Sequence, residues 1–153
     1  MQVNENTLIN ATPDQVWPFL IDPVLQAAWN PKIISIDRPK DGPVTLGEAY
    51  GMTAKLSGEQ RTTRVEVVDL IEAQLLMVQH QLTETGTGFL VTETFTLEPN
   101  GAETRVEHNI DLSQTPIPGI LKPLIKLVMK FAKPPGSQQL GRLKQMIESE
   151  VGG

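Results

Sequence analysis

The chain has 153 residues, of which 39% are hydrophobic and 20% are charged, and its formal net charge is −5. This acidic balance argues against nucleic-acid binding, because a phosphate backbone is recognised by a broad cationic surface. The absence of cysteine excludes disulfides, thiolate metal ligands and a cysteine nucleophile.

The length fits a single domain over residues 1–153, large enough to bury roughly 68–70% of the surface that its unfolded form exposes. The first ten residues, MQVNENTLIN, contain neither a basic stretch nor an apolar run, so no secretory signal is predicted. No apolar run approaches the roughly 18 residues of a membrane-spanning helix. We therefore expect a cytoplasmic protein.

The chain begins with one predicted strand and two predicted short helices. Residues 2–10 alternate as a strand does. The segment TPDQVWPFLID has the start signal of a helix, since Thr12 can cap it and Gln15 completes a capping box. The segment PVLQAAW is predicted to form the second helix, which ends at Asn30-Pro31.

From residue 32 to residue 112 the hydrophobic pattern has a period of two and is punctuated by turn residues, which is typical of antiparallel strands. Asn100-Gly101 is the strongest hairpin signal, because a type I′ turn needs positive φ at both central residues. Gly86-Thr87 suits a type II′ turn, which has glycine at its first central position. The predicted strands cover residues 32–37, 48–57, 60–70, 74–84, 88–98 and 102–112.

After residue 112 the period becomes helical. Residues 119–133 predict a basic helix, and PPGS interrupts the pattern after it. A final amphipathic helix is predicted in SQQLGRLKQMIESEV, with Leu140, Leu143 and Ile147 as its apolar stripe.

Two segments carry a resemblance to a known superfamily. They are INATPDQVWPFLIDPVLQAAWNPKIISI near the start and GRLKQMIESEV at the end. Together with the order of elements, they make the chain similar to the helix-grip (START-like, or SRPBCC) superfamily of lipid carriers, pollen-allergen-type proteins and cyclases. It most resembles the bacterial polyketide cyclase/dehydrase-like proteins, some of which have an insertion like residues 114–136 here.

The resemblance implies an α+β helix-grip fold. In such a fold a curved seven-stranded antiparallel sheet surrounds a long C-terminal helix, and two short helices connect strands 1 and 2. A cavity lies between the sheet and the C-terminal helix. The superfamily hosts many activities on one scaffold, so the resemblance predicts the fold more strongly than the function.

Three titratable side chains fall on apolar rows of the predicted sheet. A two-residue turn at Asn100-Gly101 pairs residues whose numbers sum to 201, which places Glu93 opposite His108. A two-residue turn at Gly86-Thr87 gives pairs that sum to 173, which places Glu93 opposite His80 as well. The only two histidines of the protein are therefore predicted to flank one carboxylate, on three adjacent strands and on the apolar face.

The same pairing predicts the wall of a cavity. Turns at residues 72–73 and 58–59 place Val65 beside His80 and Met52 beside Val65. Arg61 is expected at one rim, and Trp29 could close the pocket mouth. The predicted wall consists of Tyr50, Met52, Ala54, Thr63, Val65, Val67, Leu76, Val78, Phe89, Val91 and Phe95.

The histidine–glutamate–histidine row has four interpretations. It can be a self-satisfied structural network, since buried polar groups generally find partners, or a polar contact that orients a mostly apolar ligand. It can also catalyse acid–base chemistry, because a carboxylate favours the neighbouring imidazolium. A metal site requires the two histidines, about 10 Å apart across three strands, to converge over the glutamate.

We therefore predict a protein that binds a small hydrophobic molecule, either a lipid or a polyketide-like compound, without a cofactor or metal. An alternative is a cyclase or dehydratase in which His80 or His108 removes a proton α to a carbonyl while Glu93 orients it. A second alternative is a co-chaperone-like interaction module with a filled interior.

The basic helix and the oligomeric state add two open questions. The lysines of residues 119–133 lie near one helical face, which either contacts an anionic membrane surface or is simply solvated. A monomer and a homodimer both fit the sequence. These lysines are Lys122, Lys126, Lys130 and Lys133.

Overall fold

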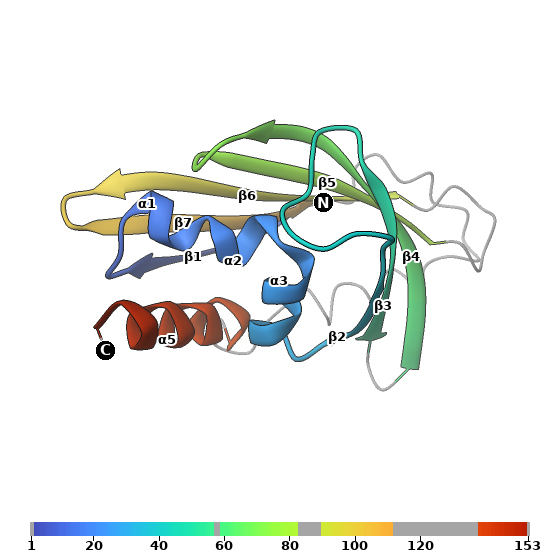
Figure 1. Ribbon diagram of the computed structural model, residues 1–153, viewed down its shortest axis with the longest axis horizontal. Coiled ribbons are helices and arrows are strands. Elements are labelled where there is room, and N and C mark those ends of the chain that lie inside the picture. Colours follow the sequence, from blue (N-terminus) through green and yellow to red (C-terminus); the bar gives the residue numbers. More distant parts are fainter. Residues whose placement is uncertain (1, 57–58, 83–89, 112–137, 153) are drawn as a thin grey trace.

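A computed structural model describes residues 2–56, 59–82, 90–111 and 138–152. Within them, seven strands form one antiparallel sheet in the order β1-β7-β6-β5-β4-β3-β2 (Figure 1). Strands β2 to β7 follow one another as neighbours, and β1 joins the free side of β7. The strands are β1 (Gln2–Ile9), β2 (Ile33–Asp37), β3 (Ala49–Leu56), β4 (Glu59–Ile71), β5 (Leu75–Leu82), β6 (Leu90–Asn100) and β7 (Glu103–Asp111).

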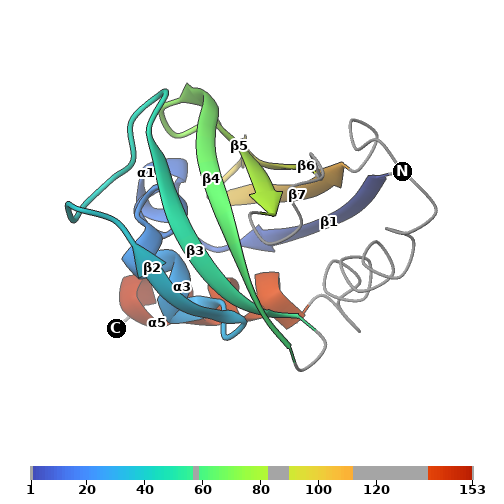
Figure 2. The same ribbon diagram turned by 90° about the vertical axis from the view of Figure 1, so that its right-hand side faces the viewer.

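Three short helices, α1 (Pro13–Val16), α2 (Pro18–Ile21) and α3 (Pro23–Trp29), connect β1 to β2, and α5 (Gln138–Gly152) is near the C-terminus. Figures 1 and 2 show these helices on the same side of the curved sheet. This arrangement confirms the predicted α+β helix-grip fold. The predicted basic helix at 119–133 and the 114–136 segment lie outside the described residues.

The first predicted helix is divided in two, and the reason is Pro18. This residue has no backbone N–H to continue the ladder of α1, so α1 ends at Val16 and α2 starts at Pro18 itself. The predicted capping box is confirmed. The backbone N–H of Gln15 donates to Thr12 Oγ1 at 3.3 Å, and the N–H of Thr12 donates to Gln15 Oε1 at 2.9 Å.

Helix α5 is fixed to the sheet by its apolar stripe and by hydrogen bonds to the β1 end. Leu140, Leu143 and Ile147 are fully buried, which confirms the predicted stripe. Lys144 Nζ donates to the carbonyl of Leu8 at 2.8 Å. The N–H of Asn10 donates to Glu148 at 2.8 Å. These contacts hold the helix against the β1 end of the sheet.

The observed register differs from the predicted one by two residues in two of the hairpins around Glu93. In β6–β7, Glu93 pairs with Ile110 and His108 pairs with Phe95. In β5–β6, Glu93 pairs with Val78 rather than with His80. The predicted direct pairings of Glu93 with the two histidines are therefore wrong. A shift of two nevertheless keeps every side chain on its face, so the predicted apolar face is retained.

The register shift in the β6–β7 hairpin follows from the position of its turn. Strand β6 continues through Asn100, and the two loop residues are Gly101 and Ala102. Gly101 has a φ of 65°, whereas neither Asn100 nor Ala102 has a positive φ. The predicted type I′ turn at Asn100-Gly101 is thus replaced by a turn one residue later, with glycine alone in the left-handed region, as in type II′.

The β3–β4 and β4–β5 hairpins also differ from the turns predicted for them. In β3–β4, Met52 pairs with Thr63 instead of Val65, which is again a shift of two. In β4–β5, the predicted pair of Val65 with His80 is confirmed, although the loop has three residues, 72–74, rather than two. A bulge between Val67 and Asp69 takes up the extra residue.

Candidate functional site

The two histidines and Glu93 meet on the inner face of the sheet. Glu93 lies diagonally between them, and each of its carboxylate oxygens accepts one hydrogen bond. His80 Nε2 lies 2.9 Å from Glu93 Oε1, and His108 Nε2 lies 2.6 Å from Glu93 Oε2. Both rings therefore donate from Nε2, because an ionised carboxylate can only accept.

The two hydrogen bonds determine the charge of Glu93. Burial by itself raises the pKa of this carboxyl group, because it disfavours the charged form. The hydrogen bonds from His108 and His80, together with the charges of these rings, outweigh burial and hold the pKa of Glu93 well below its ordinary value. Glu93 is consequently an ionised acceptor at neutral pH.

An aromatic stack behind the carboxylate fixes His108. The His108 ring lies parallel to the Phe95 ring, with centroids 4.4 Å apart and an interplanar angle of 6°. Trp29 packs edge-on against Phe95 at 6.4 Å and 88°, and its Nε1 donates to the carbonyl of Phe19 at 2.8 Å. His108 is therefore a core residue that orients Glu93, whereas the His80 side chain, which is 17% exposed, faces the open side.

A second buried carboxylate lies on the other side of His108. Glu5 of β1 pairs directly with His108 and is buried. The backbone N–H of Leu140 donates to Glu5 Oε1 at 3.3 Å, near the beginning of α5. The polar row thus continues across four strands and reaches the C-terminal helix. Glu5 was not predicted, although its spacing of two from Val3 and of four from Ile9 puts it on the apolar face of β1.

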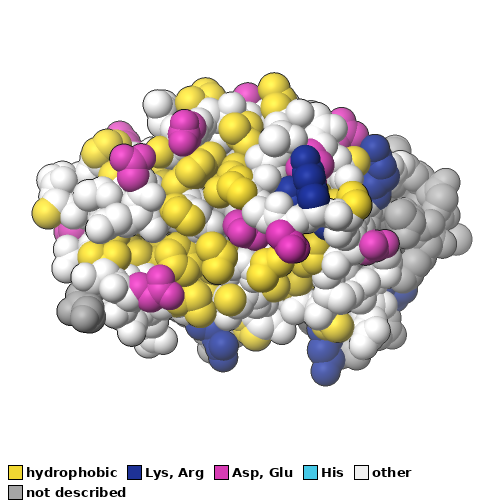
Figure 3. Space-filling model, in the orientation of Figure 1, with side chains coloured by type: hydrophobic (Ala, Val, Ile, Leu, Met, Phe, Trp, Pro, Cys, Tyr) yellow, Lys and Arg dark blue, Asp and Glu magenta, His cyan; other side chains and the backbone are white. Residues whose placement is uncertain are grey.

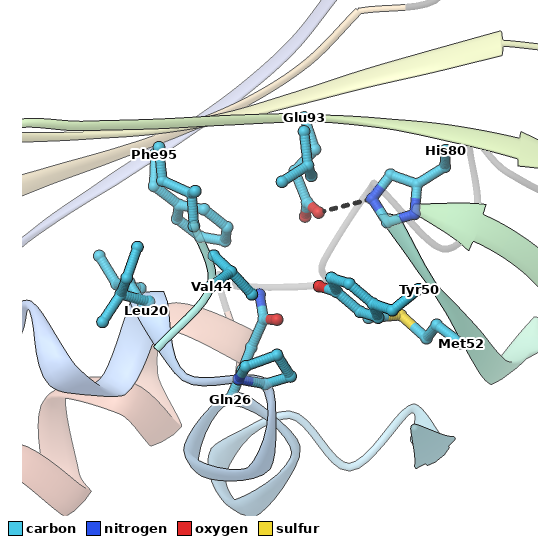
Figure 4. Close-up of a pocket in the computed structure, with 12 residues that line it drawn as sticks. Leu20, Gln26, Val44, Tyr50, Met52, His80, Glu93 and Phe95 are labelled. Carbon is cyan, nitrogen blue, oxygen red and sulfur yellow. Dashed lines mark hydrogen bonds and ion pairs between the residues drawn. The ribbon is translucent and has the colours of Figure 1, made fainter. Parts of the chain in front are cut away.

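A small pocket lies between the sheet and helices α2 and α3. Its free space is about 10 Å³, which is room for about one water molecule. In Figure 4 the Glu93 carboxylate and the His80 ring border it, while Tyr50 reaches in from β3 and Gln26 from α3. The lining residues are Leu20, Ile21, Pro23, Gln26, Val44, Tyr50, Met52, Leu76, Val78, His80, Glu93 and Phe95.

Two polar side chains of this pocket have no partner within the described part of the chain. Both the Tyr50 hydroxyl and the Gln26 amide lack a hydrogen bond there, although both residues are buried. Burial raises the pKa of Tyr50, and the negative charge of Glu93 raises it further. Tyr50 is therefore a neutral hydrogen-bond donor beside an ionised acceptor. The Tyr50 hydroxyl and the Gln26 amide can therefore each bond to a molecule that enters the pocket.

A family model now places the chain among known proteins. The model described as polyketide cyclase / dehydrase and lipid transport matches residues 1–148. The chain belongs to this family. The resemblance inferred from the sequence is thereby confirmed. No match was found among curated proteins.

Solved structures with the same fold cover almost all of this polyketide cyclase/dehydrase family member. A START superfamily protein from Mycobacterium smegmatis is 16% identical, with a TM-score of 0.68 over 97% of both chains. The protein TTHA0849 from Thermus thermophilus is 16% identical, with a TM-score of 0.69 over 98% of this chain and 99% of that chain. Protein MLL2253 from Mesorhizobium loti is 18% identical, with a TM-score of 0.69 over 97% and 98%. At these identities the likeness shows the fold alone.

The pocket of this family member contains about half of the residues predicted for it. Tyr50, Met52, Leu76, Val78, His80, Glu93 and Phe95 line it, whereas His108 does not line it and bonds to Glu93 instead. Trp29 is a core residue and does not close a pocket mouth. Six other predicted residues lie on the sheet but do not line the pocket, and Phe89 lies outside the described residues. The six are Ala54, Arg61, Thr63, Val65, Val67 and Val91.

The sequence analysis missed the helical and loop side of the pocket. Gln26 had a usable signal, because its spacing of three from both Pro23 and Trp29 puts it on the buried face of α3. Val44 had no signal, since it lies in the β2–β3 connection, where no periodic pattern applies. The other missed residues are Leu20, Ile21 and Pro23.

The described residues contain neither a metal-binding cluster nor a membrane-spanning helix. Among them, no group of three or more His, Asp or Glu side chains is arranged to hold a metal ion. No helix in the same part of the chain is long and apolar enough to cross a membrane.

Proposed function

We propose that this protein binds a small, mainly apolar molecule with a neutral, hydrogen-bonding polar end. The observation that carries the proposal is the pair of buried side chains, Tyr50 and Gln26, without partners in the described chain and beside the ionised Glu93. The remaining lining is largely apolar, and a few placed polar groups in an apolar pocket are typical of ligand sites. Lipids and polyketide-like compounds, the ligand classes of the family description, have this chemistry.

The three polar groups define which polar end fits. Glu93 accepts one hydrogen bond at each oxygen from the histidines, and a carboxylate has about four acceptor positions, so it can accept another from a ligand hydroxyl or amide. Tyr50 can donate to the same ligand group. A ligand carboxylate would meet the negative charge of Glu93, so alcohols, phenols and amides are favoured over acids.

Displacement of a fluorescent probe tests this proposal. N-phenyl-1-naphthylamine is bound first, and 1-decanol or its methyl ether, which lacks the hydroxyl donor, then displaces it. We expect the alcohol to bind more tightly than the ether, and Tyr50→Phe to weaken alcohol binding by about three- to tenfold, the worth of one hydrogen bond. Thr94→Val, which removes a hydroxyl from the opposite face of the sheet, is the matched control. Failure of both compounds to displace the probe, or equal alcohol affinity in Tyr50→Phe, would contradict the proposal.

A second candidate function is proton abstraction, as in a cyclase or dehydratase. Its support is that His80, held by Glu93, and the Tyr50 hydroxyl line the same pocket. His80 would remove a proton α to a carbonyl while Tyr50 donates to the carbonyl oxygen, so that an enolate forms and Glu93 stabilises the imidazolium.

Deuterium exchange at the α-carbons of 2-decanone, followed by NMR in D₂O, separates the two candidates. A cyclase-type site accelerates the exchange in the wild type and loses the acceleration in His80→Ala, while 1-decanol still binds. Exchange no faster than in buffer leaves ligand binding alone.

A further inference from the structure

A second, larger hollow lies on the outer side of the short helices. It has a volume of about 340 Å³, within the range of sites for small molecules. Figure 3 shows hydrophobic side chains gathered on this face over α1 and α2, with acidic side chains at the border. We call this hollow the outer groove. Its lining residues are Trp17, Pro18, Ile21, Asp22, Leu25, Pro43, Val44, Leu70 and Glu72.

The outer groove and the inner pocket have two lining residues in common. Ile21 and Val44 line both hollows, and their exposed fractions are only 5% and 6%. Two buried side chains that border both spaces form a partition between them. The inner pocket has room only for a ligand's polar end, whereas the outer groove has the volume for an apolar chain. The inner pocket therefore offers hydrogen-bonding groups for a polar end, and the outer groove offers room for an apolar chain.

One half of the partition belongs to a segment that is closed on itself by an ion pair and joined to Val67 of β4 only near its end, through the backbone of Gly47 and Glu48. Residues 38–48 connect β2 to β3, and Arg38 donates to both oxygens of Glu48, at 2.5 and 3.1 Å. Arg38 also donates to the carbonyls of Gly42 and Pro43, at 2.6 and 3.0 Å. The bonds between Arg38 and Glu48 join the two ends of the segment. We call the whole set of Arg38 bonds the clasp.

Val44 is attached to the helices by a buried side chain and by one backbone hydrogen bond. Its backbone N–H donates to the carbonyl of Ile21 at 2.9 Å. Gly42 and Gly47, with φ values of 90° and 85°, flank it, and glycine passes through such conformations without steric penalty. The segment can thus displace Val44 without disturbing the sheet hydrogen bonds of β2 or β3.

We propose that the outer groove is the tail subsite of the same ligand site and that Val44 is the gate between the two hollows. The proposal rests on the proposed function, since the polar end of the ligand occupies the pocket at Tyr50 and Glu93. Its apolar chain passes between Ile21 and Val44 and lies against Trp17 and Leu70. The ligand class is a neutral molecule with a linear apolar chain. Asp22 and Glu72 in the groove lining disfavour an anionic group on this chain.

The test measures how affinity depends on chain length. Displacement of N-phenyl-1-naphthylamine by 1-hexanol, 1-octanol, 1-decanol and 1-dodecanol gives one dissociation constant per chain length. Burial of each added methylene in the groove is expected to tighten binding by up to about fourfold. Leu70→Asp, at a half-buried groove position, should weaken dodecanol binding much more than hexanol binding and abolish most of the gain from octanol to dodecanol. Leu25→Asp, also half-buried, is a second variant with the same expectation.

The control is Ile34→Asp, which places the same charge at a 45% exposed position on β2 outside both hollows. Thermal unfolding establishes that each variant is folded. Unchanged length dependence in both groove variants, with Tyr50→Phe still weakening every alcohol, would overturn the tail subsite and leave the proposed function standing. Failure of every alcohol to displace the probe, in wild type and variants, would overturn the proposed function instead.

Discussion

The two walls of the inner pocket are built differently. On β5–β7, the polar side chains bond to one another, and the sheet and the stack of His108 on Phe95 hold them in place. On the opposite wall, Gln26 has no side-chain partner within the described residues, and Val44 belongs to a segment closed by the clasp. The first wall is expected to define the chemistry of the site, and the second to admit the ligand.

This difference has a physical reason. Sheet positions are constrained on both sides by neighbouring strands, so a buried carboxylate there can be given two accurately placed donors. A connection such as residues 38–48 is constrained through its ends, a few side-chain bonds and single backbone bonds such as that from Val44 to Ile21, and regions of this kind open at lower free energy than the sheet. Four predictions distinguish the walls, from the largest expected effect to the smallest.

Removal of His108, the buried hydrogen-bond donor to Glu93, should have the largest effect on stability. His108→Ala leaves a buried carboxylate with one donor fewer and removes the stack on Phe95, so we expect the free energy of unfolding to fall by about 3–5 kcal/mol. Urea denaturation measures this loss. Glu107→Ala, on the outer face of the same strand, is the control. Adding Glu93→Gln to His108→Ala should restore part of the stability by removing the unpaired charge. No restoration would mean that packing alone explains the loss.

Opening of the clasp should have a smaller effect on stability and a specific effect on kinetics. The Arg38 and Glu48 side chains are only 3% and 10% exposed, and the hydrogen bond from Arg38 lowers the pKa of Glu48. We expect Glu48→Gln to lower the free energy of unfolding by about 1.5–3 kcal/mol. Stopped-flow fluorescence with N-phenyl-1-naphthylamine should show faster association and dissociation with little change in Kd.

The matched control for the clasp is Glu66→Gln, which breaks the exposed Arg64–Glu66 pair, whose side chains are 50% and 43% exposed. We expect it to change the free energy of unfolding by less than about 0.5 kcal/mol and to leave both rates unchanged. Equal rates in Glu48→Gln and the wild type would show that the clasp does not limit entry.

Acidification should weaken the sheet wall through Glu93. Its folded-state pKa lies below the ordinary value of 4.5, so the unfolded chain takes up this proton first as the pH falls. The stabilisation is fully present above about pH 5.5 and decreases by about 1.4 kcal/mol per pH unit below the ordinary carboxyl range. Urea denaturation between pH 3 and pH 7 should show this extra slope in the wild type and in Glu107→Gln, but not in Glu93→Gln. Parallel curves for wild type and Glu93→Gln would contradict the depressed pKa.

Replacement of Gln26 by an apolar side chain should have the smallest effect on stability, and this effect should not be a loss. Gln26→Leu replaces a buried amide without a partner in the described chain by an apolar side chain of similar size, so stability should stay equal or rise by about 1 kcal/mol. The same change should weaken 1-decanol binding, as expected where stability and function conflict. Gln60→Leu, at an exposed position on β4, is the control. A clear loss of stability in Gln26→Leu would show that the amide has a structural role.

The histidine–glutamate–histidine contact could be predicted although both of its direct pairings were wrong. Alternation places Glu93, His80 and His108 on one face, and the two errors were each a shift of two residues, which leaves the face unchanged. The three side chains then meet diagonally instead of directly opposite one another. Long polar side chains reach across a diagonal, so the contact tolerated an error that would have separated smaller residues.

The helix and loop side of the pocket could be predicted only in part. The spacing of Gln26 and Trp29 along α3 was a readable signal that the sequence analysis did not use. The position of Val44 was not readable, because a connection has no period that relates one residue to the next. Its place between two hollows depends on Arg38 bonding to Glu48 and on one backbone bond to Ile21.

The sequence by itself determined the order of elements, the faces of the strands and the buried stripe of α5, because each follows from a local period of two or 3.6 residues. Only the tertiary structure decided which residues pair across the sheet, that His108 lies behind Glu93, and that Tyr50 and Gln26 converge on the same small space. These are contacts between segments far apart in the chain. They depend on turn lengths, a bulge and the docking of helices. A local sequence period describes none of these features, and each of them changes where later residues lie.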